Sequence, residues 1–150
     1  MLNNHNGGGA ARIEWLVLAD SAQVVGNKLY LLGGGWDSIA APNGFPIQHQ
    51  MAIALSVLVP WQETTQKRAF EVEILNEQGV SQVKVNGELE VPGNPGVMPG
   101  EIRRSQIALA ISLKLEKQGK YAVTARIDGG EPVHSSFNVS LGFNMAQRPR

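Results

Sequence analysis

The chain has 150 residues, with 13 Lys and Arg, 13 Asp and Glu, and no cysteine. Balanced charge argues against a nucleic-acid partner, because neutralising phosphates supplies most of the affinity for nucleic acids. The lack of cysteine excludes disulfides, thiolate metal sites and cysteine nucleophiles.

No segment reaches the roughly 18 apolar residues of a membrane helix. Residues 1–10 are polar, with no basic region ahead of an apolar run, so we expect a cytoplasmic protein without a membrane partner. The length suits one domain. We expect a β-sandwich domain over residues 11–143, a disordered tail over residues 1–10 and a C-terminal tail over residues 144–150.

Apolar residues alternate from the start of this domain, which is typical of strands. In residues 12–20, one face of the predicted strand carries Ile13, Trp15, Val17 and Ala19. The other face carries Leu16 and Leu18. We expect Trp15 in the core. Gly26-Asn27 is a turn, since both residues tolerate positive φ, and residues 28–32 return to complete a hairpin.

The same period of two continues along the chain. It predicts further strands over residues 51–59, 68–75, 81–91, 106–116, 120–128 and 132–141. Residues 106–116 could also suit a helix by propensity, but five apolar residues at spacing two would scatter around a helix. About eight strands without a helix predict an all-β fold, a sandwich of two antiparallel sheets.

Three consecutive glycines, Gly33, Gly34 and Gly35, raise the question of a phosphate-binding loop. The sequence lacks the G-x-x-x-x-G-K-[ST] motif, and residues 36–41 read as strand again, whereas a dinucleotide site needs a helix there. We therefore predict a structural bulge. On this interpretation Gly34→Val lowers stability.

Trp36 and Asp37 follow the bulge, and Trp61 follows a strand end. A presented tryptophan beside a carboxylate could stack on a sugar ring and bind its hydroxyls, which gives an alternative function in carbohydrate binding. The structural alternative is that both tryptophans close the ends of the sandwich.

Catalytic and metal-binding patterns are weak. Glu71 and Glu73 share a strand face, as do Glu88 and Glu90, at a separation that inverting glycosidases use. Their outward positions favour a solvated face. The histidines, at positions 5, 49 and 134, have no metal-ligand spacing. We expect no metal, no cofactor and no catalytic residue, and a hydrolase is the least favoured function.

Two loops are the best candidates for a binding surface. Residues 90–105 contain three prolines and three glycines, which excludes a helix or a central strand, and long loops are often functional. Met98, Arg103 and Arg104 would contact a partner there. Residues 41–50 form a similar loop with Phe45 at its tip, and the two loops would form one surface if they met at one end.

QGKYAVTARIDGGEPVHSSFNVS, residues 118–140, resembles the last hairpin of bacterial immunoglobulin-like domains. The resemblance implies that Gly119 opens a strand and that the Tyr121 hydroxyl bonds back to the preceding connection. EWLVLADSAQVVGNKLYLLGGGWDSI, residues 14–39, is similar to a family of short uncharacterised bacterial proteins. That resemblance implies a single domain and no catalytic motif.

Together these observations predict a non-enzymatic interaction module. Its partner would be another protein or a second copy of the chain, bound through Phe45, Met98, Arg103 and Arg104. The alternatives are the carbohydrate-binding module with Trp36, Asp37 and Trp61, and the hydrolase. Gly33, Gly34, Gly35 and Tyr121 would have structural roles.

Overall fold

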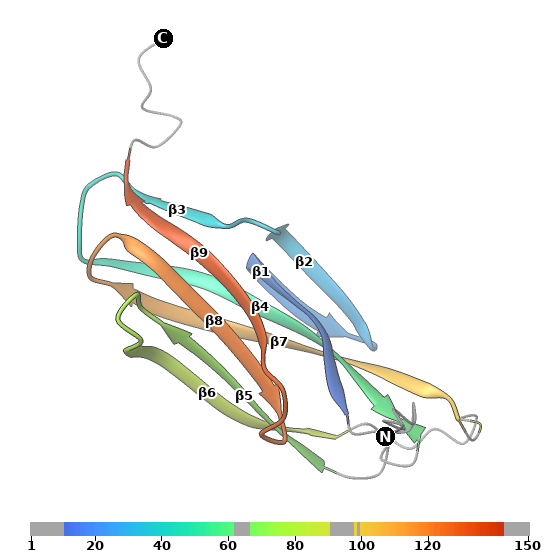
Figure 1. The fold of residues 1–150 in the computed structure, drawn as a ribbon. Helices are drawn as coiled ribbons and strands as arrows, with labels where there is room; N and C mark the ends of the chain where they lie inside the picture. The colour runs from blue at the N-terminus through green and yellow to red at the C-terminus, as the bar shows by residue number, and fades with distance from the viewer. Residues whose placement is uncertain (1–10, 62–66, 91–97, 99, 143–150) are drawn as a thin grey trace.

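The computed structural model describes residues 11–61, 67–90, 98 and 100–142. Figure 1 shows the nine strands that these residues form. They are β1 (Arg12–Val25), β2 (Lys28–Gly34), β3 (Ser38–Ala41), β4 (Ile47–Pro60), β5 (Lys67–Leu75), β6 (Ser81–Glu90), β7 (Ile102–Leu115), β8 (Gly119–Ile127) and β9 (Val133–Leu141). The predicted tails, residues 1–10 and 144–150, lie outside the described residues.

The strands build two sheets, in the orders β2-β1-β4-β7 and β3-β9-β8-β5-β6. The predicted all-β, two-sheet sandwich is confirmed, with nine strands instead of about eight. One pair differs from an antiparallel sandwich: β3 runs parallel to β9. The reason is that residues 35–37 carry the chain from β2, at the edge of one sheet, to the adjacent edge of the other, where β3 runs beside β9 in the same direction (Figure 1).

The core lies between the sheets and centres on β4. The predicted alternation is confirmed here, because the inward residues of this strand are all buried; they are Met51, Ile53, Leu55, Val57 and Val59. Removing one such side chain from water contributes about 1.5–3 kcal/mol. Ala52, Ala54 and Ser56 on the opposite face are also buried, since β1 and β2 approach β7 across that face.

The first strand corrects the face assignment made from the sequence. The pairing of β1 with β4 shifts by one residue between Ile13 and Trp15, so Glu14 forms a bulge. A one-residue shift turns every following side chain to the other face. Leu16 and Leu18 therefore point inward, whereas Trp15 lies opposite Ser56 on the outer face, half-buried. The expectation that Trp15 is a core residue is wrong.

The last hairpin contains the tyrosine bond that the sequence resemblance implied. The Tyr121 hydroxyl donates a hydrogen bond to the Lys117 carbonyl at 2.8 Å. The Tyr121 ring lies parallel to the Phe137 ring, with centroids 5.4 Å apart, and the two residues face each other across β8 and β9. The bond fixes the β7–β8 connection to the core.

We expect Tyr121→Phe to lower the free energy of unfolding by about 1 kcal/mol, because it removes this hydrogen bond and keeps the ring stacking. Urea denaturation of the two proteins side by side measures the difference. Tyr30→Phe is the matched control, since the Tyr30 ring is exposed, and its stability should be unchanged. Equal stability of Tyr121→Phe and the natural protein would show that the bond contributes nothing.

Candidate interaction surface

The described parts of the two candidate loops, residues 41–50 and residues 98 and 100–105, lie at opposite ends of the sandwich (Figure 1). β4 begins beside the end of β7 and ends beside the start of β7. A strand of this length spans roughly 45 Å. Phe45, at one end, packs against the core, and Met98, at the other end, is 64% exposed. The described parts of the two loops therefore do not meet at one end, which was the condition for one combined surface.

Arg103 and Arg104 lie in β7 and not in a loop. Arg104 donates two hydrogen bonds, both of 2.7 Å, to the Glu14 carboxylate, and the Ser56 hydroxyl donates a third at 2.7 Å. These bonds from Arg104 and Ser56 lower the pKa of Glu14 to about 2. The group connects β1, β4 and β7, and the guanidinium of Arg104 is occupied within its own chain.

The tryptophans of the carbohydrate hypothesis are not brought together. Trp36 is half-buried and packs edge to face against His49 and Phe137, with ring centroids 5.9 Å from each. Trp61 lies at the far end of β4. Asp37 uses its carbonyl to accept a hydrogen bond from the Asn138 N–H at 2.8 Å. The structure thus places Trp36 as a closing residue of the sandwich and forms no shared aromatic wall with Trp61.

The burial of His49 predicts a pH-dependent stability. Burial lowers the pKa of His49 below 6.5, an effect that the charge of Asp20 opposes, and the buried Nε2 atom has no hydrogen-bond partner in the described part of the chain. Between the lowered pKa and 6.5 the unfolded chain binds more protons than the folded one. The free energy of unfolding should therefore fall as the pH drops below about 6.5.

We expect His49→Gln to flatten this part of the stability profile, measured by urea denaturation between roughly pH 7 and pH 5. His134→Gln is the control, because His134 is exposed on β9, and it should keep the natural slope. An unchanged slope in His49→Gln would assign the pH dependence to other groups.

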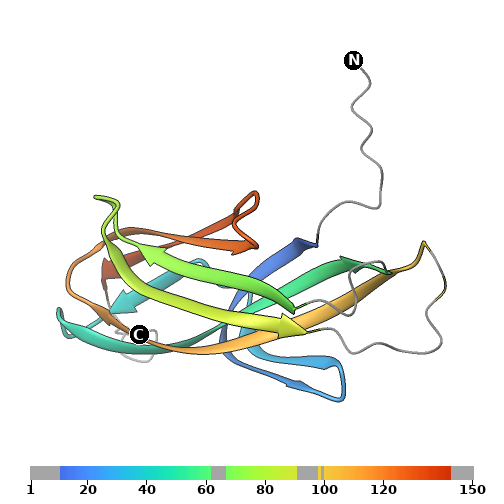
Figure 2. The ribbon, with the colours of Figure 1, turned by 90° about the horizontal axis from the view of Figure 1, so that it is seen from below.

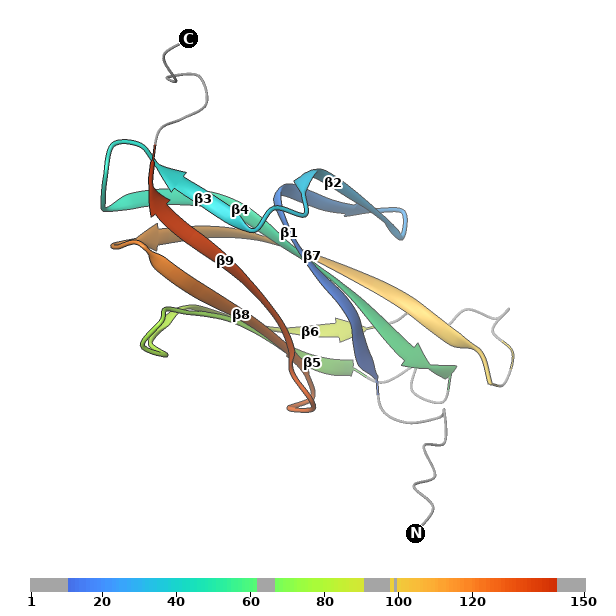
Figure 3. The ribbon, with the colours of Figure 1, turned by 45° about the horizontal axis from the view of Figure 1, so that its top comes forward.

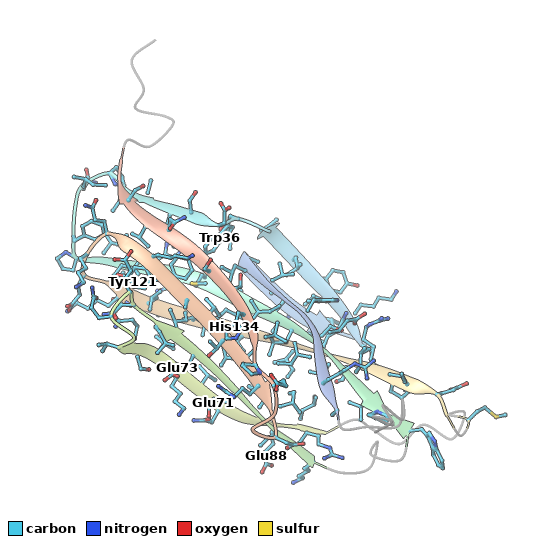
Figure 4. The ribbon with its side chains drawn as sticks, viewed as in Figure 1. Trp36, Glu71, Glu73, Glu88, Tyr121 and His134 are labelled. Carbon is cyan, nitrogen blue, oxygen red and sulfur yellow. The ribbon has the colours of Figure 1, made fainter. Side chains whose placement is uncertain are left out.

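The paired carboxylates lie on the larger sheet, where the register places Glu73 opposite Thr124 on β8 and Thr124 opposite His134 on β9. Figure 4 shows Glu71 and Glu73 on β5 and, close to Glu71, Glu88, which lies on β6 opposite Ala69. Glu71 forms an ion pair with Lys84 at 3.6 Å, and Glu88 forms one with Lys67 at 3.9 Å. These positions fit a solvated sheet face. The side chain of Glu90 and the whole of His5 lie outside the described residues.

The glycine run ends β2 and redirects the chain to β3. Gly33 and Gly35 have φ values of +62° and +85°, which favour glycine. The Gly35 N–H donates to the Leu18 carbonyl at 2.8 Å, so this amide is not directed at a ligand. A Cβ at Gly33 would overlap the Asp20 carboxylate, whereas a Cβ at Gly34 would make ordinary contacts. The constraint therefore lies at Gly33 and not at Gly34.

The β1–β2 hairpin carries the main group of exposed apolar side chains among the described residues. We call this group the hairpin surface, and its members are Val24 (36% exposed), Val25 (51%), Tyr30 (56%), Leu31 (41%) and Leu32 (72%). Figure 2 shows the hairpin projecting beyond β4 and β7, away from the five-stranded sheet. By the register of the hairpin, Val25, Tyr30 and Leu32 lie on one face of the ribbon and Val24 and Leu31 on the other. Exposed apolar side chains gathered in this way mark interaction sites.

The geometry of the hairpin follows from its turn. Gly26 and Asn27 have φ values of +56° and +62°, as a two-residue turn of the primed type requires. β1 pairs with β4 only as far as Ala19 and with β2 from Ala19 onward. β2 is the end strand of its sheet, and Figure 3 shows it at the rim of the molecule. Its outer edge is therefore open.

Sequence reasoning predicted this hairpin and missed its surface. The available signal was the run of residues 29–32, LYLL, which is apolar on both faces of a short strand. A strand that buries one face usually alternates apolar and polar residues. An unbroken apolar run in an end strand indicates that the side chains facing away from the core are buried by a partner.

Comparison with known proteins identifies a family without an assigned activity. Residues 14–140 match the model of a family of unknown function, DUF6941. A search of curated proteins finds no match for the chain. Within the described residues, no helix is long and apolar enough to cross a membrane.

Proposed function

Because the chain belongs to this family of unknown function, its activity has to be inferred from its own residues, and we propose that it is a non-enzymatic protein-binding module. The binding element is β2, which takes up a strand of the partner along its open edge. In this mode of recognition, main-chain hydrogen bonds supply affinity and alternate side chains supply specificity.

The observation that carries this proposal is the hairpin surface on an end strand. A two-stranded ribbon is marginally stable alone, and here it exposes Val25, Tyr30 and Leu32. A third strand along β2 would satisfy the open backbone groups and cover these side chains. The same surface supports a protein partner over a sugar, because its members are mainly aliphatic.

The placement of the titratable residues supports a function without catalysis. Glu71 and Glu88 are in ion pairs with lysine, and His49 and His134 lie on strands of different sheets. Glu73, Thr124 and His134 lie in one row across β5, β8 and β9, and His134 is exposed there, which favours a solvated sheet face over a catalytic site. We place the protein in the cytoplasm, where a chain without cysteine needs no oxidising compartment.

Affinity capture from a native lysate, with matched variants, tests the proposal. Tyr30→Lys/Leu32→Lys adds charge to the hairpin surface, and Val80→Lys/Leu141→Lys changes two exposed apolar residues elsewhere. We expect bound protein, including untagged copies of this chain, to be lost only from the hairpin variant. Equal capture by all three proteins, or capture by none, would contradict binding through β2.

A further inference from the structure

We infer that the partner of β2 is a second copy of this chain, bound by antiparallel β2–β2 pairing around a twofold axis at Leu31. This inference rests on the proposed function and names its partner. Homodimers with twofold symmetry place the same surface of each copy against itself. A strand edge meets this condition if it can pair with an identical strand that runs in the opposite direction.

The other end strands carry features that prevent edge pairing. β3 has only four residues. β6 carries Lys84 and Glu88, and β7 carries Arg104 and Lys114. Short length and charge are the usual means by which proteins block edge-to-edge association. β2 has seven residues with one charge, at Lys28, so it is the unprotected edge among the described strands.

The backbone of β2 fixes the register. Val25 lies opposite Lys28 across the two-residue turn, and hydrogen bonding alternates along an antiparallel pair. The N–H and C=O groups of Leu29 and Leu31 therefore point to the open edge. Pairing centred on Leu31 sets Leu31 opposite itself, Tyr30 opposite Leu32 and Leu29 opposite Gly33 of the second copy, so the two central kinds of pair join apolar residues.

Charge selects the antiparallel direction. Asp20 and Lys28 are the charged residues of the hairpin between positions 19 and 35, and they lie at its opposite ends. The Asp20 carboxylate lies over Gly33, at the end of β2, and Lys28 begins the strand. Antiparallel pairing brings Lys28 of each copy to the acidic end of the other. Parallel pairing would bring like charges together.

The first test is sedimentation equilibrium of the full chain over roughly two orders of magnitude in concentration. We expect a reversible monomer–dimer equilibrium for the natural protein. Leu32→Lys should weaken it by about tenfold or more, because it replaces the apolar contact of Leu32 with Tyr30 of the second copy by a hydrated charge. Val80→Lys, at another exposed apolar position outside β2, should leave it unchanged.

The second test uses charge reversal. Lys28→Glu and Asp20→Lys should each be monomeric, because each homodimer would carry like charges at both ends. Mixed in equal amounts, they should form a heterodimer. At one end of the paired strands the introduced glutamate of one variant then meets the introduced lysine of the other, and at the opposite end the natural Asp20 meets the natural Lys28. Circular dichroism of each variant before mixing confirms that the fold is intact.

The outcomes separate this inference from the proposed function. A natural protein that stays monomeric at every concentration, or a dimer that survives Leu32→Lys, would overturn self-pairing. If the lysate partner were still lost from Tyr30→Lys/Leu32→Lys in that case, binding through β2 would stand with a different protein as partner. Failure of the mixed charge variants to associate would overturn the antiparallel register.

Discussion

Phe137→Ala is expected to lower the free energy of unfolding by about 3–5 kcal/mol, the range for removing a buried aromatic side chain. Phe137 is 1% exposed. Its ring stacks on Tyr121 and makes an edge-to-face contact with Trp36, so its loss leaves a cavity bordered by two large rings, one from β8 and one from the β2–β3 connection. Those rings are held by their own packing and can close the cavity only in part.

Urea denaturation followed by circular dichroism measures this effect. Phe137→Leu keeps most of the apolar volume and should cost clearly less than the alanine variant. Leu141→Ala is the control on the same strand, because Leu141 is exposed, and it should change stability by less than about 0.5 kcal/mol. A loss below about 1.5 kcal/mol for Phe137→Ala would show that the site collapses without a cavity.

The sequence predicted the sandwich because the strands that form its core keep a period of two without interruption. β4 shows this best, since each of its alternate residues from Met51 to Val59 is buried as predicted. β1 shows the limit of the method. The bulge at Glu14 reverses the faces of Trp15 and Leu16, and no local pattern reveals it, because both faces of this strand are apolar.

The candidate site was harder to predict for a topological reason. Loops stand out by composition, but whether two loops meet depends on the direction of the strands between them. Phe45 and Arg103 are separated by the length of β4. Alternation predicts that β4 is a strand, but it does not predict which residues lie at which end of the sandwich. The apolar run of the hairpin surface can be seen in residues 29–32 of the sequence. Its exposure follows from the position of β2 at the end of its sheet, which depends on the order of all the strands.

Gly33→Ala is expected to destabilise the protein by about 2 kcal/mol, and Gly34→Ala by less than about 0.5 kcal/mol. Gly33 has φ +62°, a conformation that costs other residues about 1–2 kcal/mol, and its new Cβ would also displace the Asp20 carboxylate. Gly34 lies in regular strand geometry, where a Cβ would meet Ala19 and Leu31 at 3.6 Å, an ordinary contact.

Thermal and urea denaturation of the two variants measure this contrast, which also bears on binding. Displacing Asp20 removes the acidic end of β2, so Gly33→Ala should weaken self-association as well as the fold, whereas Gly34→Ala should keep both. A larger loss of stability in Gly34→Ala than in Gly33→Ala would instead support the original expectation for Gly34. It would mean that the bend at the end of β2 depends on close approach of the strands and not on the left-handed conformation of Gly33.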